Sequence, residues 1–185
     1  MSRKKKLAIA GATGFIGRWF IETYKDKYDI IALSRKKVNP SNSDVEWRMV
    51  DLFSISSSNN ALEGVDYALY LVHSMQPSTR LNQSNFEDTD LLLADNFARA
   101  AQNCNLKHIV YVGGILPKDN LNISKHLQSR FEVEQVLGSR ITPVTAVRAG
   151  IIIGPGGSSF RIVTKLVKNL PIMAVSYTHL RAHET

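Results

Sequence analysis

The sequence predicts an α/β protein built around a doubly wound parallel sheet with helices on both faces. Short apolar runs alternate with longer amphipathic segments along most of the chain. Strands separated by helices in this way pair in parallel through right-handed crossovers. The chain has 185 residues, of which 44% are hydrophobic and 21% charged. This composition is ordinary for a globular protein and allows one domain with a substantial core.

The first half of the chain contains four expected strands, at residues 7–10, 28–33, 45–50 and 67–72. A helix is expected after the first strand, because five apolar side chains recur there at helical spacing and predict a face packed against the sheet. These side chains are Phe15, Ile16, Trp19, Phe20 and Tyr24. The polar, serine-rich run 54–60 leads into the end of a short helix, which Gly64 closes.

The second half continues the alternation of strands and helices, without an internal repeat or a linker between domains. Strands are expected at 108–112 and 143–148, and helices at 86–103, 124–137 and 159–169. Ser124 is a suitable cap for the helix that it opens, and Gly138 is a suitable stop.

The loop after the first strand has the glycine spacing of a dinucleotide site. Gly11 allows a tight turn, Gly14 lets the backbone approach a pyrophosphate, and Gly17 allows close packing of helix against strand. Free amides at the start of the helix would then face the anion. An ordinary glycine-rich turn is the alternative interpretation. The expected phosphate-binding residues are Gly11, Ala12, Thr13, Gly14, Phe15, Ile16 and Gly17.

The end of the second strand indicates which dinucleotide is bound. An NAD site is expected to place Asp or Glu there, to accept a hydrogen bond from the adenosine ribose. This chain has Ser34 and Arg35, followed by Lys36 and Lys37. Because a guanidinium suits a 2′-phosphate, the sequence favours NADP(H) over NAD(H). A solvated basic turn remains the alternative.

Composition and charge exclude several classes of protein. The net charge is +7, but the basic residues are scattered apart from the clusters 3–6 and 35–37. Neither cluster carries interleaved aromatics, so no nucleic-acid partner is expected. No apolar run approaches the roughly 20 residues that span a bilayer, so we expect no membrane segment in this fragment and a cytoplasmic location. The single cysteine, Cys104, is expected to be a small buried residue rather than a nucleophile.

The segment 175–185 resembles the translation of a transposase sequencing adapter, and we exclude it from fold reasoning. Its His179, His183 and Glu184 have helical metal-ligand spacing, but we reject a metal site on this ground. The expected organisation is an incomplete dinucleotide-binding domain at 1–174, truncated at its C-terminus, followed by a non-native tail.

Residues 5–174 resemble the short-chain dehydrogenase/reductase superfamily. The glycine loop 11–17 has the spacing of its extended and atypical branches. The segments 70–75, 126–130 and 148–154 resemble a bacterial atypical subgroup of NmrA-like, epimerase/dehydratase-like, NAD(P)-binding proteins. The resemblance implies a Rossmann fold.

The same resemblance implies roles for residues outside the glycine loop. Asp51 and Leu52 occupy the place where the superfamily holds the adenine ring. Leu71, Val72 and His73 follow the strand that passes beneath the cofactor.

The usual catalytic set of the superfamily is replaced in this chain. Active members carry a serine, a tyrosine and a lysine where this sequence has Gly113, His126 and Arg130. The i, i+4 spacing is kept, so His126 and Arg130 should share a helix face. Histidine titrates close to neutral pH, and a neighbouring guanidinium favours its neutral form. Proton transfer by His126 is therefore one interpretation, and a purely structural His126 with a ribose-binding or phosphate-binding Arg130 is the other.

Other candidates have equally good structural explanations. His73 and Ser74 could line the pocket or cap a loop, and Arg148 could meet an anionic substrate or an internal carboxylate. Tyr111 is expected in the core. The leading hypothesis is an NADP(H)-dependent oxidoreductase of an unknown small molecule, and the alternative is a non-catalytic redox sensor or assembly factor. The sequence predicts neither the substrate nor the oligomeric state.

Overall fold

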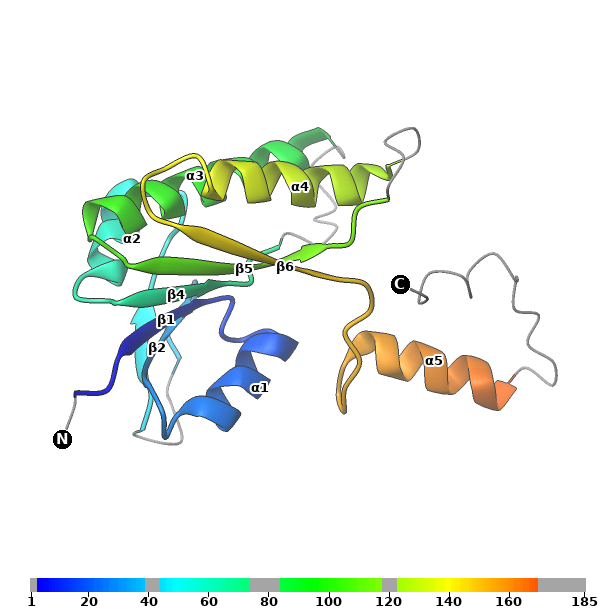
Figure 1. Ribbon diagram of the computed structural model, residues 1–185. Helices are drawn as coiled ribbons and strands as arrows, with labels where there is room; N and C mark the ends of the chain where they lie inside the picture. Colours follow the sequence, from blue (N-terminus) through cyan, green and yellow to red (C-terminus); the bar gives the residue numbers. More distant parts are fainter. Residues whose placement is uncertain (1–2, 39–43, 74–83, 118–122, 170–185) are drawn as a thin grey trace. The chain divides into compact units, whose positions relative to one another are not determined.

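The computed structural model describes residues 3–38, 44–73, 84–117 and 123–169. The chain divides into two compact units, residues 1–150 and 151–185. In its described residues, the first unit holds six strands and four helices (Figure 1). The strands are β1 (Lys6–Ala10), β2 (Asp29–Ser34), β3 (Glu46–Met49), β4 (Tyr67–Tyr70), β5 (His108–Gly114) and β6 (Val144–Ala149). The helices are α1 (Phe15–Tyr24), α2 (Ile55–Leu62), α3 (Ser84–Asn103) and α4 (Lys125–Leu137).

The second unit contributes the helix α5 (Ser158–Asn169) to the described part of the chain. The predicted extension of the first domain to residue 174 stays a prediction. The segment 175–185, interpreted as a non-native tail, lies outside the described residues.

The strands of the first unit form one parallel sheet in the order β3-β2-β1-β4-β5-β6. The chain therefore runs outward from β1 in one direction and then from β4 in the other. Helices α2, α3 and α4 cover one face and α1 covers the other (Figure 1). The prediction of a doubly wound sheet is confirmed. Its switch point lies between β1 and β4, where ligands of such sheets bind beyond the carboxyl ends of the strands.

Two apolar clusters form the core, one on each face of the sheet. In β1, Ala8 and Ala10 face the α2–α4 side, while Leu7 and Ile9 face the α1 side. This alternation follows the period of two in a strand. On the larger side, the rings of Tyr70 and Phe97 lie 4.9 Å apart, between centroids, and join β4 to α3.

Helices α2 and α4 each begin at a serine cap. The Ser54 side chain accepts a hydrogen bond from Ser57 N, and Ser124 accepts one from Leu127 N. The cap at Ser124 is as predicted. The serine-rich run after Ser54 is already helical, so α2 includes most of the segment that was expected only to precede a helix end. Gly64 follows α2 with φ +69°, a conformation that favours glycine.

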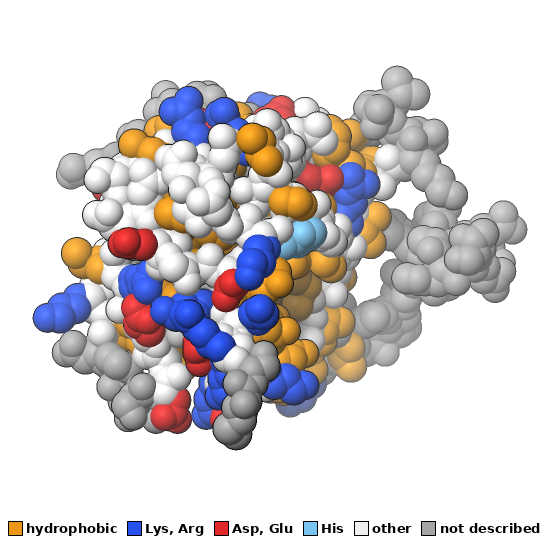
Figure 2. Space-filling view, turned by 60° about the vertical axis from the view of Figure 1, so that its left-hand side comes forward, with side chains coloured by type: hydrophobic (Ala, Val, Ile, Leu, Met, Phe, Trp, Pro, Cys, Tyr) orange, Lys and Arg blue, Asp and Glu red, His pale blue; other side chains and the backbone are white. Residues whose placement is uncertain are grey.

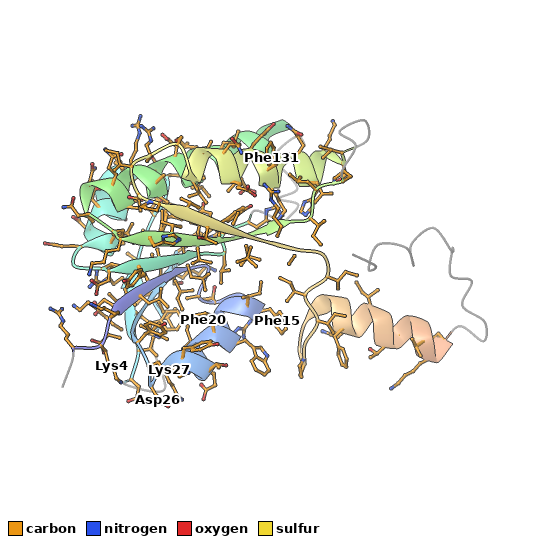
Figure 3. The ribbon with its side chains drawn as sticks, viewed as in Figure 1. Lys4, Phe15, Phe20, Asp26, Lys27 and Phe131 are labelled. Atoms are coloured by element: carbon orange, nitrogen blue, oxygen red, sulfur yellow. The ribbon has the colours of Figure 1, made fainter. Side chains whose placement is uncertain are left out.

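One predicted core residue is wrong. Trp19 is 53% exposed, whereas Phe20, Ile21 and Tyr24 pack against the sheet. Phe20 projects from α1 in Figure 3. The buried Gly17 sets the inward direction of this helix, and at about 100° per residue Trp19 lies on the opposite side. Periodicity alone did not reveal that a glycine, rather than the largest apolar side chain, marks the contact with the sheet.

In the described part of the chain, the helices are all too short or too polar to cross a bilayer. On the face shown in Figure 2, Lys and Arg side chains are interspersed with Asp and Glu side chains.

Candidate functional site

The glycine loop joins β1 to α1 at the carboxyl edge of the sheet. Gly11 has φ +89°, and its carbonyl oxygen accepts a hydrogen bond from Gly14 N at 3.0 Å, which closes the turn. Gly14 is the N-cap of α1 in an extended conformation, without a side-chain cap. The first turn of α1 contains no acidic residue. The positive end of the α1 dipole is therefore not neutralised by an acidic side chain in the first turn.

The glycines are required because backbone fills the space beside them. A Cβ on Gly17 would lie 2.5 Å from Gly11 O and 2.7 Å from Ala12 Cα. A Cβ on Gly11 would lie 3.0 Å from the carbonyl of Leu71, just beyond β4. The tight turn at Gly11 and the close packing at Gly17 thus have the geometry expected from the sequence. The resulting cradle of backbone suits a diphosphate, which needs amides rather than side chains.

The residues expected on the adenosine side lie at the ends of β2 and β3. Ser34 ends β2, and its hydroxyl accepts a hydrogen bond from Lys36 N. Arg35 is exposed and forms no ion pair with another described residue. Asp51 is exposed, and one of its carboxylate oxygens accepts a hydrogen bond from Phe53 N.

Helix α3 fixes the turn after β3. The Asn96 side chain donates hydrogen bonds to Leu52 O at 2.9 Å and to Phe53 O at 3.1 Å. Leu52 is buried. The predicted adenine-binding segment is therefore held from α3, a contact that no local motif in the sequence indicates.

Helix α4 carries the two candidate catalytic residues and is tied to β5 through one of them. The Arg130 guanidinium donates a hydrogen bond to Val112 O at 2.8 Å, and the Tyr111 hydroxyl donates one to Arg130 O at 3.1 Å. Tyr111 is buried, as expected for a core residue. A Cβ on Gly114 would lie 2.5 Å from a methyl carbon of Leu127, so α4 approaches β5 closely. Arg130, predicted to stand in place of the usual lysine, thus holds α4 against β5.

His126 lies against a second histidine. The ring centroids of His73 and His126 are 4.8 Å apart, with the planes at 67°. The pKa of His126 is lowered, chiefly because part of the ring is desolvated, and further by the neighbouring His73 and Arg130. The predicted effect of the guanidinium on His126 has the right direction, although burial is the larger cause.

Sequence reasoning missed Asp90, which is 5% exposed. Its Oδ2 lies 3.0 Å from Nδ1 of His73. Asp90 shares the inward face of α3 with Ala94, Phe97 and Ala101, all of which are buried. A carboxylate in register with an apolar stripe is the signal that could have identified it, because buried carboxylates are retained only with partners.

The remaining candidates are accounted for by local contacts. Arg148 pairs with Glu134, from Nη2 to Oε1 at 2.7 Å and from Nε to Oε2 at 3.2 Å, which bears out the internal-carboxylate interpretation. Cys104 was predicted to be buried but is only partly buried, packed against the core. Its thiol donates to Asn59 O, and burial raises its pKa, which disfavours the thiolate. Ser74 lies outside the described residues. Within the described ranges, no group of His, Cys, Asp and Glu side chains could hold a metal ion.

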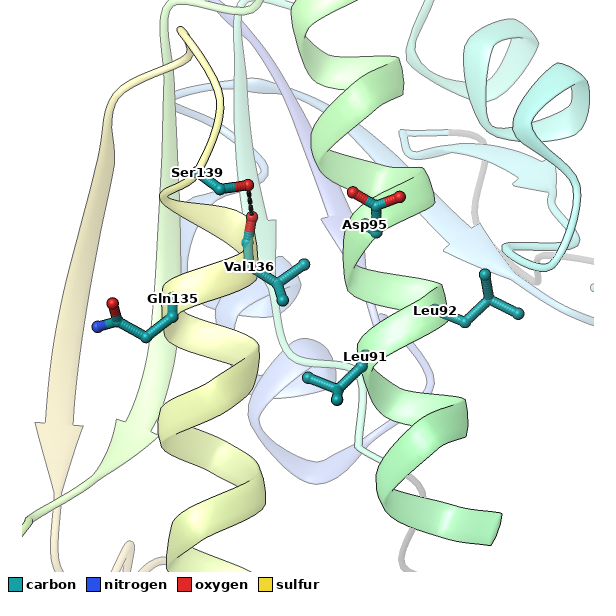
Figure 4. A pocket seen from close by; sticks show the side chains of 6 residues that line it. All are labelled: Leu91, Leu92, Asp95, Gln135, Val136 and Ser139. Atoms are coloured by element: carbon teal, nitrogen blue, oxygen red, sulfur yellow. Dashed lines mark hydrogen bonds between the residues drawn. The ribbon is translucent and has the colours of Figure 1, made fainter.

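An open apolar depression of about 510 Å³ lies between α3 and α4 (Figure 4). Its walls come from Leu91, Leu92, Asp95, Gln135, Val136 and Ser139. None of these is a predicted site residue, so this depression is separate from the glycine loop.

Comparison with known proteins identifies relatives of this chain. Residues 7–129 match the model of the NAD dependent epimerase/dehydratase family. The chain is 30% identical over 145 residues to the "Auxiliary protein GraX" of Staphylococcus aureus (strain NCTC 8325 / PS 47), covering 76% of this chain and 43% of that protein. The chain thus spans less than half the length of this relative.

Solved structures share the fold. The UDP-N-acetylglucosamine 4-epimerase from Bacillus cereus has a TM-score of 0.68 and 22% identity, covering 89% of this chain and 65% of that one. The enzyme WbmG from Bordetella bronchiseptica, solved in complex with NAD, has a TM-score of 0.74 and 15% identity, covering 90% and 60%. At these identities the likeness establishes the Rossmann fold alone.

Proposed function

The chain belongs to the NAD dependent epimerase/dehydratase family, and from this premise we propose that the protein is an NADP(H)-dependent oxidoreductase of a small molecule. The family places it among the NAD(P)-binding proteins of the short-chain dehydrogenase/reductase superfamily, in the atypical branch. The observation that carries the proposal is the glycine cradle, in which an added Cβ would collide with backbone at Gly17 and would be tightly confined by backbone at Gly11.

The proposed cofactor site runs along the carboxyl edge of the sheet. The loop 11–17 would hold the diphosphate, Asp51 and Leu52 would hold the adenine, and the segment 71–73 would lie beneath the dinucleotide. The nicotinamide, when bound, supplies or accepts a hydride. The protein supplies the proton that accompanies this transfer, and we propose that His126 takes part in moving it. Its lowered pKa leaves the ring neutral near physiological pH, so that it can accept a proton.

The proposed preference for NADP(H) rests on the charge at the end of β2. Arg35 is exposed there without an ion-pair partner among the described residues, and the adjacent position is Ser34 rather than an acid. A guanidinium can bind a 2′-phosphate with two parallel hydrogen bonds. We further propose that the protein acts in the cytoplasm, on a small molecule, without nucleic acid or membrane as partner.

Calorimetric titration of the chain with NADPH and NADH tests the cofactor proposal. We expect NADPH to bind more tightly, and Arg35→Ala to weaken NADPH binding about tenfold while leaving NADH unchanged. Lys4→Ala is the matched control, because it removes an exposed charge beside the opposite end of β1. Equal weak binding of both dinucleotides, unaltered by Arg35→Ala, contradicts the proposal.

A second candidate is a non-catalytic sensor of dinucleotide redox state. It is supported by the replacement of the usual serine, tyrosine and lysine by Gly113, His126 and Arg130, and by the use of Arg130 to hold Val112 O. The curated relative is itself called an auxiliary protein. Binding of NADPH without its oxidation across a broad carbonyl panel favours the sensor, whereas oxidation that His126→Gln abolishes favours the enzyme.

A further inference from the structure

The end of β4 brings a histidine to the carboxyl edge of the sheet, beside the glycine loop. Leu71 N donates a hydrogen bond to Ala10 O at 2.9 Å, so the chain beyond β4 is fixed to the end of β1. A Cβ on Gly11 would touch the carbonyl of Leu71. His73 follows two residues later and is partly buried. It therefore lies at the edge where doubly wound sheets bind ligands.

Asp90 determines which nitrogen of the His73 ring carries the hydrogen. With Oδ2 of Asp90 at 3.0 Å from Nδ1, the hydrogen of a neutral ring belongs on Nδ1, and Nε2 is left as an acceptor. The atom Nε2 is buried and has no hydrogen-bond partner among the described residues. A buried polar atom without a partner calls for a specific explanation, because most such atoms are satisfied.

The two imidazoles are in contact, and one of them reaches solvent. His126 packs edge to face against His73 and is the more exposed of the two. The charged groups around them in the described structure are Asp90 on α3 and Arg130 on α4, and the interaction of Asp90 with His126 opposes that of Arg130. His126 can thus exchange a proton with solvent, and His73 is the ring with the oriented, unsatisfied nitrogen.

We propose that His73 is the catalytic residue that exchanges a proton with the reacting oxygen of the substrate, that Asp90 positions it, and that His126 connects it to solvent. In the reductive direction His73 starts as the imidazolium, with hydrogen on both ring nitrogens. Its Nε2–H bond breaks, an O–H bond forms on the substrate, the electron pair stays on Nε2, and the ring is left neutral with its hydrogen on Nδ1. The two electrons that reduce the substrate carbon come from the nicotinamide dinucleotide, so this inference rests on the proposed function. The oxidative direction reverses each transfer.

The test is a nitrogen-15 NMR experiment on the chain labelled in its histidine rings, which reports which ring nitrogen carries hydrogen. Above neutral pH we expect His73 to carry it on Nδ1, and Asp90→Asn to remove this preference. Asp95→Asn is the matched control, because Asp95 lies on the same helix and pairs with Arg99 and Arg140 instead. It should leave the His73 tautomer unchanged.

Dinucleotides are then added to the unmutated chain. The positive ring of NADP⁺ should shift the His73 Nε2 resonance by more than its linewidth relative to the neutral ring of NADPH. Adenosine 2′,5′-bisphosphate, which lacks nicotinamide, should leave Nε2 unshifted. Because these additions use the unmutated chain, they test the inference even if Asp90→Asn does not fold.

Two failures can be told apart in this experiment. If no dinucleotide moves the amide resonances of Gly11 and Gly14, the proposed function fails and the inference falls with it. If those amides move but His73 carries its hydrogen on Nε2, or its resonance is the same with NADP⁺ and NADPH, the inference alone is overturned.

Discussion

The glycine loop and the histidine corner occupy the same edge of one sheet but are built in opposite ways. The loop consists of seven consecutive residues, and its shape depends on three glycines, since Cβ atoms added to Gly11, Gly14 or Gly17 would meet backbone. The corner, formed by His73, Asp90, His126 and Arg130, joins the end of β4 to α3 and α4 through side chains. Substitution in the loop should therefore damage the fold, whereas substitution in the corner should change protonation and leave the fold largely intact.

The strongest test of this difference is Gly17→Ala. The added Cβ would lie 2.5 Å from Gly11 O, and both loop and helix must move because the obstacle is backbone. We expect a loss of about 3 kcal/mol in the free energy of unfolding, measured with urea. Gly138→Ala is the control, since its Cβ would meet only an ordinary contact at 3.4 Å. Equal stability of the two variants would show that the loop is not sterically determined.

Arg130→Met tests the part of the corner that is structural. It removes the hydrogen bond to Val112 O but keeps much of the apolar length of the side chain. We expect a loss of about 1.5 kcal/mol in unfolding free energy. Arg99→Met, at an exposed ion pair with Asp95, should cost about 0.5 kcal/mol or less. If Arg130→Met costs no more than the control, Arg130 does not anchor α4.

Ser124→Ala tests whether the N-cap of α4 stabilises the histidine corner. The Ser124 hydroxyl accepts from Leu127 N at the start of the helix that carries His126. Its loss should cost about 1 kcal/mol in chemical denaturation. Ser56→Ala, at an exposed position in α2, should be close to neutral. A neutral Ser124→Ala would mean that contacts with β5, rather than the cap, fix this end of α4.

The smallest expected effect is the pH dependence from His126. Its pKa is lowered in the folded chain, so the unfolded chain binds more protons as the pH falls below about 6.5. The stability that His126 contributes is fully present above that value and is lost as the pH falls through the folded pKa. Because solvent screens the exposed ring, the loss should not exceed about 0.5 kcal/mol.

Unfolding of the unmutated chain and of His126→Gln, compared across this pH range, measures the difference. His108→Gln is the control, since His108 lies at the start of β5 and contacts Thr145. If the unmutated chain instead gains stability on acidification relative to His126→Gln, the pKa of His126 is raised by folding rather than lowered.

The sequence predicted the doubly wound sheet and the order of its elements because these depend on local patterns. Apolar runs, serine caps and glycine spacing all act within a few residues. Trp19 was placed wrongly because the direction of α1 is set by the packing of Gly17, not by apolar content. The candidate cofactor residues remain predictions, although the loop has the expected shape.

Asp90 was not predicted because its partner, His73, is seventeen residues away on another element. Its position within the apolar stripe of α3 marks it as unusual, but only the fold reveals the imidazole opposite. The hydrogen bond from Arg130 to β5 was not predicted, for a similar reason. The acceptor Val112 O is a backbone atom, which no pattern of residue types can identify.

Helix α3 carries both Asp90 and Asn96, which are six residues apart and therefore separated by about 9 Å along the axis. The Asn96 side chain donates to the backbone of the turn after β3, and the Asp90 carboxylate contacts the ring of His73. One helix thus orders both halves of the sheet edge, the turn beyond β3 through Asn96 and the imidazole of His73 through Asp90.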